Sequence, residues 1–267
     1  MTLPEWLTDV TVNQEIAMVA GNFHCLKQPI SKVPWSIQSI VDACLARFAE
    51  KKQTLQQRGY LDSQVQSLIG FDFKSEIEFV TSVLARLKQR IVFASNDMNR
   101  SNFLVLTDPN TGCDLHPRQI LLIDYEFCSY NYRGFDLGNY FGMKVFDFGG
   151  EKFITGERYP PLEYRMEFIR KYIETVRDLP NKPHDWDEET IDSPENILME
   201  ADFGSFAVRL INIAWVLRDL DNWRDIMRER SKRVPDADSE GTFSAFPDYY
   251  RERKKQFLSQ YPQFNTQ

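Results

Sequence analysis

Cysteine is scarce in this sequence, and long apolar runs are missing from it. The four cysteines, Cys25, Cys44, Cys113 and Cys128, lack the paired spacing of a metal site, and residues 1–14 lack the apolar core of a signal peptide. No later stretch reaches the apolar length of a membrane span. We therefore expect reduced thiols in a cytoplasmic protein and no structural zinc site.

Positive charge is also in short supply. The chain has 32 Lys and Arg residues against 39 Asp and Glu residues, which gives a net charge of -7. The densest basic cluster, at residues 224–233, is interrupted by Asp225 and Glu229 and is typical of a solvated helix face. This charge distribution argues against a nucleic-acid partner, because the phosphate backbone would be repelled.

Apolar residues recur at helical spacing over most of the chain and at strand-like spacing in its middle. Short apolar runs at 91–93, 103–106 and 120–123, separated by turn residues, predict a strand followed by a hairpin. The helical segments are expected at residues 14–27, 36–55, 75–89, 162–178, 197–230 and 248–260.

A polar loop at residues 95–102 lies between two of these apolar runs, and it contains Asp97 and Asn102, five positions apart. Asp124 follows the last run. Phosphoryl transfer needs one carboxylate to accept the proton of an attacking hydroxyl, and oxygen ligands to hold Mg²⁺ on the nucleotide phosphates. Asp and Asn also stabilise turns and cap helices, so the spacing alone leaves a structural role open.

The segment after this loop has a more specific pattern. Residues 121–141 read LLIDYEFCSYNYRGFDLGNYF. This run resembles the signature of the choline/ethanolamine kinase family, in which I-D-[FYW]-E-Y precedes S-Y-N and then F-D-[LIF]-[AG]-N-H-F. The matching positions are Ile123, Asp124, Glu126, Ser129, Tyr130, Asn131, Phe135, Asp136, Gly138, Asn139 and Phe141. The resemblance to the family is looser in three other parts of the chain, namely residues 12–35, residues 159–173 and the region around Trp215.

The resemblance implies an α+β fold, the large lobe of a protein-kinase-like enzyme of the choline kinase/aminoglycoside phosphotransferase type. It would be mostly helical, with a small β-hairpin at the catalytic loop. One unit would span residues 1–267, with a helical segment at 14–90, the catalytic loop, hairpin and signature at 91–146, and a C-terminal substrate-side segment at 147–267.

The resemblance also implies an activity, the phosphorylation of choline or ethanolamine for phosphatidylcholine and phosphatidylethanolamine synthesis. ATP would be the co-substrate and Mg²⁺ the cofactor. The partner would be a small amino alcohol, with a homodimer left open. By resemblance, Asp97 would be the catalytic base, and Asn102 and Asp124 would bind Mg²⁺.

Two further residues would support the loop. Asp136 would cap a helix that begins near Leu137 and would brace the catalytic loop. Ser95 stands where the family usually has His, a residue that braces the loop in related kinases, so weakened loop geometry is expected.

The substrate pocket departs most from the family. Phe127 stands where Tyr is usual, and Met143 and Lys144 replace a Glu-Trp pair, so an acid is lost and a cation gained where a cationic substrate would bind. Trp215 aligns with the second Trp of a W-x-x-W helix whose first position is Asn212. With Tyr249, these residues predict an incomplete aromatic cage, although Trp215 and Tyr249 also suit a hydrophobic core.

The family's small lobe, with its phosphate-covering loop, has no counterpart in this sequence, and no G-x-G-x-x-G motif occurs in it. Three interpretations follow: a working kinase acting on an amino alcohol or a related small alcohol, a truncated or divergent relative with a binding or regulatory role, and an incomplete form of a longer enzyme.

Overall fold

The computed structural model describes residues 10–107, 110, 119–146, 159–233 and 243–265. The helices are α1 (Val10–His24), α2 (Ile37–Gln57), α3 (Gln66–Ile69), α4 (Phe73–Leu84), α5 (Arg133–Gly142), α6 (Leu162–Asp178), α7 (Pro194–Ala207), α8 (Arg209–Arg218), α9 (Leu220–Arg233) and α10 (Ala245–Gln260). The strands are β1 (Ile91–Ala94), β2 (Phe103–Val105), β3 (Ile120–Leu122) and β4 (Ser129–Tyr132). The fold is thus mostly helical, and no described helix is long and apolar enough to cross a membrane.

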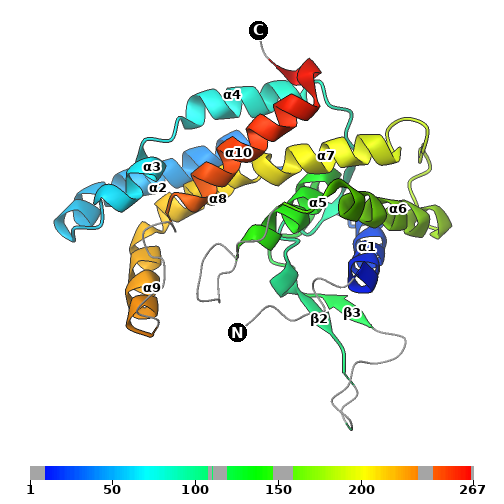
Figure 1. Cartoon of the computed structure of the whole chain (residues 1–267), viewed down its shortest axis with the longest axis horizontal. Helices are drawn as coiled ribbons and strands as arrows, with labels where there is room; N and C mark the ends of the chain where they lie inside the picture. The colour runs from blue at the N-terminus through cyan, green and yellow to red at the C-terminus, as the bar shows by residue number, and fades with distance from the viewer. Residues whose placement is uncertain (1–9, 108–109, 111–118, 147–158, 234–242, 266–267) are drawn as a thin grey trace.

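The strands form two small antiparallel sheets. β2 and β3 form the predicted hairpin, with Phe103 opposite Leu122, and they lie on the side of the molecule away from α4 and α10 (Figure 1). β1 pairs with β4, where Ile91 faces Tyr132. β4 was not predicted, because its sequence S-Y-N-Y contains no apolar run. This second sheet fixes the start of the loop that carries Asp97, and the β2–β3 hairpin fixes the end of the loop.

Most helices lie where the apolar periodicity predicts them. The segments predicted at 36–55 and 162–178 are confirmed as α2 and α6, and the long segment predicted at 197–230 is divided into α7, α8 and α9. The prediction of a helix beginning near Leu137 was wrong, because α5 already begins at Arg133. Tyr132 is its N-cap residue and makes no side-chain cap hydrogen bond.

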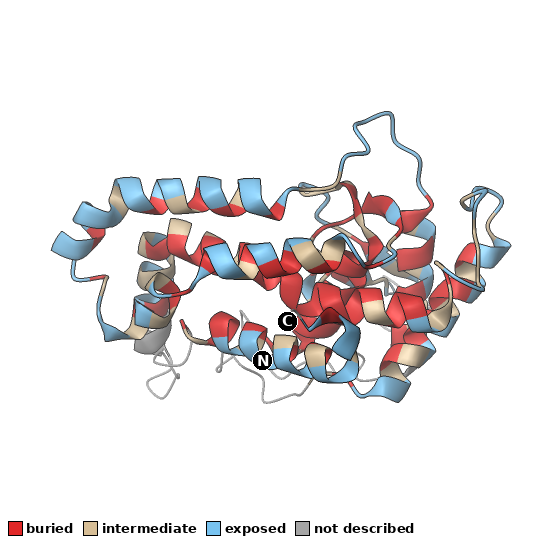
Figure 2. Cartoon of the chain, turned by 90° about the horizontal axis from the view of Figure 1, so that it is seen from above, coloured by how far each residue is buried: buried red, intermediate tan, exposed pale blue. Residues whose placement is uncertain are grey.

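Helices α5 and α7 run through the middle of the molecule in backbone contact. A Cβ atom added to Gly138 would lie 2.3 Å from the backbone nitrogen of Ser205, and one added to Gly204 would lie 1.9 Å from the carbonyl oxygen of Gly134. Only glycine permits such an approach. One hydrophobic cluster, from α2, α4, α8 and α10, packs on one side of this pair, and a second, from α1 and α6, packs on the other (Figures 1 and 2).

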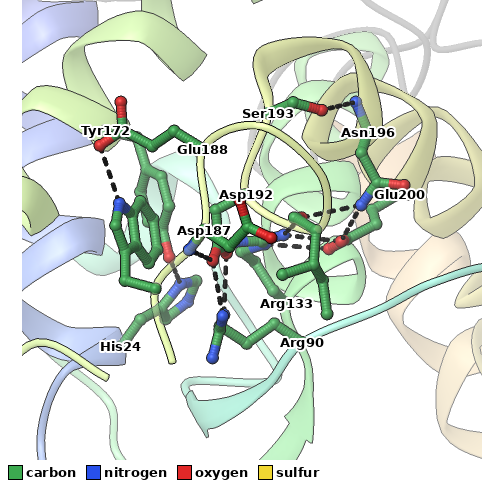
Figure 3. A network of polar contacts seen from close by, with 12 residues as sticks. His24, Arg90, Arg133, Tyr172, Asp187, Glu188, Asp192, Ser193, Asn196 and Glu200 are labelled. Atoms are coloured by element: carbon green, nitrogen blue, oxygen red, sulfur yellow. Dashed lines mark hydrogen bonds and ion pairs between the residues drawn. The ribbon is translucent and has the colours of Figure 1, made fainter. Parts of the chain in front are cut away.

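A buried ion network ties α5 and α7 to Arg90, the residue directly before β1 (Figure 3). Arg133, at the start of α5, donates to both carboxylate oxygens of Glu200 at 2.9 and 2.6 Å and to Asp192 at 2.6 Å. Arg90 donates to the same Asp192 carboxylate at 2.8 and 2.5 Å. Burial raises the pKa of Glu200 to about 7, although the charge and hydrogen bonds of Arg133 oppose the rise. The network holds α5 against β1.

Candidate active site

The loop after β1 is anchored by a buried carboxylate from α5. Asp136, which has no exposed surface, accepts hydrogen bonds from the backbone N–H groups of Ser95 and Asn96, both at 2.7 Å. The carboxylate lies within the first turn of α5 and does not cap that helix, which corrects the capping role expected for it. It instead fixes the two residues that precede Asp97.

Asp136 is itself held by a histidine from the first helix. His24 Nε2 lies 3.1 Å from Asp136 Oδ2, and His24 Nδ1 lies 3.0 Å from the Tyr172 hydroxyl (Figure 3). A carboxylate can only accept, so Nε2 is the donor in this arrangement. The buried His24 thus supports the loop from behind, through Asp136. Ser95, at the position where the family usually has His, accepts a hydrogen bond at its Oγ from the backbone N–H of Asp97 at 3.4 Å. Sequence reasoning missed His24, which follows the apolar stripe of α1.

Asn96 gives the loop an unusual backbone conformation. Its φ angle of 60° lies in the left-handed region, which L residues other than Asn and Asp rarely adopt. The side chain is satisfied on both sides, because Nδ2 donates to Phe127 O at 2.8 Å and to Ser129 Oγ at 2.9 Å, while Oδ1 accepts from Asn131 at 2.6 Å. These contacts join the loop to the part of residues 121–141 that precedes and forms β4.

Asp97 and Asn102 are brought into direct contact. Asn102 Nδ2 donates to the side-chain Oδ2 and to the backbone oxygen of Asp97, both at 2.9 Å. Burial raises the pKa of Asp97, and hydrogen bonds from Asn99 and Asn102 and the charge of Arg209 oppose that rise. A half-buried carboxylate that is oriented by an amide is suited to accept a proton from a bound hydroxyl.

The hairpin brings Asp124 to the same place. Ile123 N–H donates to the Asn102 carbonyl at 2.8 Å, and this bond joins the end of β3 to the loop. Asp124 follows with a left-handed φ of 63° and an exposed side chain. The negative charge of Asp124 adds to the rise in the pKa of Asp97. The three residues singled out by their spacing therefore lie in one region of the structure.

The donor set suits a magnesium ion that is shared with phosphate. The amide nitrogen of Asn102 faces Asp97, which leaves its oxygen as the atom for a cation, and Asp124 adds an exposed carboxylate. Mg²⁺ prefers such oxygen ligands and commonly completes its shell with phosphates and water. No cluster of three or more His, Cys, Asp or Glu side chains that could hold an ion occurs in the part of the chain that the structure describes. Phosphate oxygens and water would complete the shell of an ion held by Asn102 and Asp124.

The predicted substrate-binding aromatics fall into two groups. The rings of Phe127 and Trp215 lie 5.5 Å apart, and Trp35, which sequence reasoning missed, meets Phe127 edge-on at 6.2 Å. Tyr249 belongs to another group, where its ring lies 5.2 Å from that of Phe146. The structure therefore does not bring Tyr249 into ring contact with Phe127 or Trp215.

Lys144 and Met143, which replace the family's Glu-Trp pair, contact different side chains. Lys144 is buried and donates to the Tyr164 hydroxyl at 2.5 Å. The side chain against Met143 is instead Arg209, whose Nη1 lies 2.9 Å from the sulfur. The run FAVRLINIAW is apolar except for Arg209 and Asn212, but this pattern does not show which way the Arg209 side chain points.

Comparison with known proteins identifies the family of this chain. The family model described as choline/ethanolamine kinase matches residues 3–257. The chain belongs to the choline/ethanolamine kinase family. It is 29% identical to mouse choline kinase alpha over 171 residues and 30% identical to a probable ethanolamine kinase of Arabidopsis thaliana over 215 residues.

These relatives are longer than the chain. The matches cover 62% and 80% of this chain but 36% of the mouse protein and 50% of the Arabidopsis protein. Among solved structures, the choline kinase of Cryptosporidium parvum matches 96% of this chain with a TM-score of 0.59 and 19% identity, and covers 68% of its own length. The ethanolamine kinase of Plasmodium vivax matches 92% of this chain with a TM-score of 0.60 and 16% identity, over 62% of its own length. These likenesses establish the fold.

Proposed function

We propose that this chain carries the proton-accepting and metal-binding residues of a phosphotransferase. The reaction would move the γ-phosphoryl group of ATP to the hydroxyl of a small alcohol. The observation that supports it best is the convergence of Asp97, Asn102 and Asp124 through the bonds described above. Choline and ethanolamine, the acceptors in the relatives' names, are the first candidates, and either would feed phospholipid head-group synthesis.

Each residue has a defined task in this proposal. Asp97 accepts the hydroxyl proton while the acceptor oxygen bonds to the γ-phosphorus and the bond from that phosphorus to the bridging oxygen breaks, releasing ADP. Asn102 orients the Asp97 carboxylate by donating a hydrogen bond from its Nδ2 to Asp97 Oδ2. Asn102 and Asp124 would hold the metal, which when bound neutralises charge on the phosphates.

Asp136 and His24 act through the loop and are positioning residues. The two N–H groups that Asp136 binds precede Asp97 directly, so a shift of this carboxylate would move the proton acceptor. A displacement of about 1 Å can lower the rate of a positioned reaction about 10²-fold.

A binding role without turnover is the alternative. It is favoured by Met143 and Arg209, which meet where an acid would serve a cationic acceptor, and by the partial coverage of the relatives. Such a chain would keep the fold of the site and form no product.

The deciding experiment is a phosphoryl-transfer assay. The purified 267-residue chain is incubated with MgATP and choline or ethanolamine, and the phosphorylated alcohol is followed by phosphorus NMR. We expect product from the wild type and a rate lowered about 10²- to 10⁴-fold in Asp97→Asn, which removes the proton acceptor. Addition of excess EDTA should stop the reaction.

Asp42→Asn is the matched control, because Asp42 lies exposed on α2 and bonds only locally to Gln38. This variant should retain the wild-type rate. A folded wild-type chain that forms no product with either acceptor would contradict the amino-alcohol kinase and leave either the phosphorylation of another small alcohol or the binding role.

A further inference from the structure

A second buried arginine lies beside the proposed site without a carboxylate partner. Arg209, the first residue of α8, has no exposed surface. Its Nη2 donates to Asn139 Oδ1, its Nη1 contacts the Met143 sulfur, and no carboxylate of a described residue forms an ion pair with it. Burial lowers the pKa of Arg209 to about 10. A buried cation that has only neutral partners is unfavourable until an anion approaches it.

Arg209 and two residues linked to it, Asn212 and Tyr249, carry unsatisfied polar atoms. Six buried side-chain polar atoms of the described residues lack a well-oriented hydrogen bond, and three of them belong to Arg209 (Nε), Asn212 (Oδ1) and Tyr249 (hydroxyl). Asn212 follows Arg209 by three positions, so both lie on one face of α8. The Arg209 guanidinium and the Tyr249 ring both pack on Phe146, at 5.9 and 5.2 Å. Such unmet groups are what a polar ligand could satisfy.

The arginine is also connected to the proton-accepting loop. Asn139, which accepts from Arg209, donates through Nδ2 to the carbonyl of Met98 at 3.4 Å, and Met98 directly follows Asp97. The positive charge of Arg209 lowers the pKa of the Asp97 carboxylate and so opposes the effect of burial. A small molecule paired with Arg209 could therefore place its hydroxyl at Asp97.

We propose that Arg209, with Asn212 and Tyr249, recognises the acceptor, and that this acceptor is a small alcohol bearing a carboxylate. The proposal rests on the phosphoryl transfer proposed above and narrows its acceptor. A carboxylate would pair with the guanidinium and accept from its free Nε–H. An ammonium would meet the positive charge of Arg209, with Met143 where the resemblance predicts an acid.

The test compares two alcohols that differ in the sign of one charge. Binding of 3-hydroxypropionate and of ethanolamine to the full chain is measured by ligand-observed NMR titration. We expect the wild type to bind 3-hydroxypropionate at least about tenfold more tightly, a ratio expected for one charge-assisted hydrogen bond. Arg209→Met should remove this preference, and Tyr249→Phe, which deletes one oxygen, should weaken 3-hydroxypropionate binding a few-fold.

Arg86→Met is the matched control, because Arg86 donates to the backbone carbonyls of Gln263 and Phe264. It should leave the ratio unchanged. Tighter binding of ethanolamine, no binding of either alcohol, or an unchanged ratio in Arg209→Met would each overturn the proposal.

Turnover separates this proposal from the one on which it rests. Arg209-dependent binding of 3-hydroxypropionate without phosphorylation of any alcohol would support the acceptor site and contradict the kinase. Phosphorylation of choline or ethanolamine at lower KM than 3-hydroxypropionate would support the kinase and contradict the acceptor site.

Discussion

Among the residues that the structure describes, Arg133 and Arg209 are the two arginines with fully buried side chains, and they have opposite surroundings. Arg133 donates to the carboxylates of Glu200 and Asp192, whereas Arg209 contacts an amide and a thioether. A buried charge that is paired and hydrogen-bonded can be part of a stable scaffold, but one without an anion costs stability. The comparison fits a scaffold role for Arg133 and supports our proposal that Arg209 serves a ligand.

The largest expected effect comes from removing Arg133. Arg133→Met leaves Glu200 and Asp192 with fewer partners in the interior, and breaking a buried pair in this way costs about 3–5 kcal/mol of unfolding free energy. Urea unfolding followed by circular dichroism measures the change. A loss below about 1 kcal/mol would mean that the network adds little to stability.

The next effect concerns the pH dependence of the same network. The folded-state pKa of Glu200, about 7, lies above its ordinary value of 4.5, so the folded chain binds the proton more tightly. The stability gained from this proton is fully present below pH 4.5 and is lost as the pH rises through 7. Relative to Glu200→Gln, the wild type should lose up to about 3 kcal/mol between pH 5 and 8. Parallel stability curves for the two proteins would contradict this.

A moderate effect is expected from His24, which holds the Asp136 carboxylate behind the loop. His24→Leu removes hydrogen bonds to Asp136 and to the Tyr172 hydroxyl and should cost about 2 kcal/mol. The specific measurement is amide hydrogen exchange at Ser95 and Asn96, which should become faster. Tyr172→Phe, which removes only the hydrogen bond between His24 and the Tyr172 hydroxyl, should leave this exchange close to the wild-type rate. Unchanged exchange in His24→Leu would mean that Asp136 needs no support.

The smallest effect in the series belongs to a surface pair. Arg177 lowers the pKa of Glu188 to about 2 by hydrogen bonding. Because this folded-state pKa is depressed, its stabilisation is present above pH 4.5 and is lost as the pH falls towards 2. Solvent screens the pair, so Glu188→Gln should change the melting temperature less than any substitution above. A decrease in melting temperature as large as that caused by Arg133→Met would contradict the distinction between buried and exposed pairs.

Sequence reasoning reached the proton-accepting loop because local spacing carries its chemistry. Asp97, Asn102 and Asp124 lie within 28 positions of one another and flank apolar runs that become β1, β2 and β3. The hairpin and most helices were predictable for the same reason, since apolar periodicity is a local signal. Strand β4 was not, because its pairing with β1 depends on tertiary contacts and its own residues are polar.

The parts of the site that sequence reasoning missed come from distant segments. His24 lies 112 positions before Asp136, and Arg209 lies 70 positions after Asn139. Nothing in the local pattern of α1 or α8 shows that these side chains point towards the loop. The aromatic residues at 215 and 249 were assigned to one cage by resemblance, whereas the packing of α8 and α10 places Tyr249 against Phe146.

The most direct test of a functional Arg209 is the unfolding free energy of Arg209→Met, measured in the same urea titration as Arg133→Met. Methionine removes an unpaired buried charge while keeping much of the apolar volume, and such replacements are often neutral or stabilising. We predict that the variant unfolds within about 1 kcal/mol of the wild type, or is more stable. A loss of about 3–5 kcal/mol, as expected for Arg133→Met, would contradict the comparison and make Arg209 part of the scaffold.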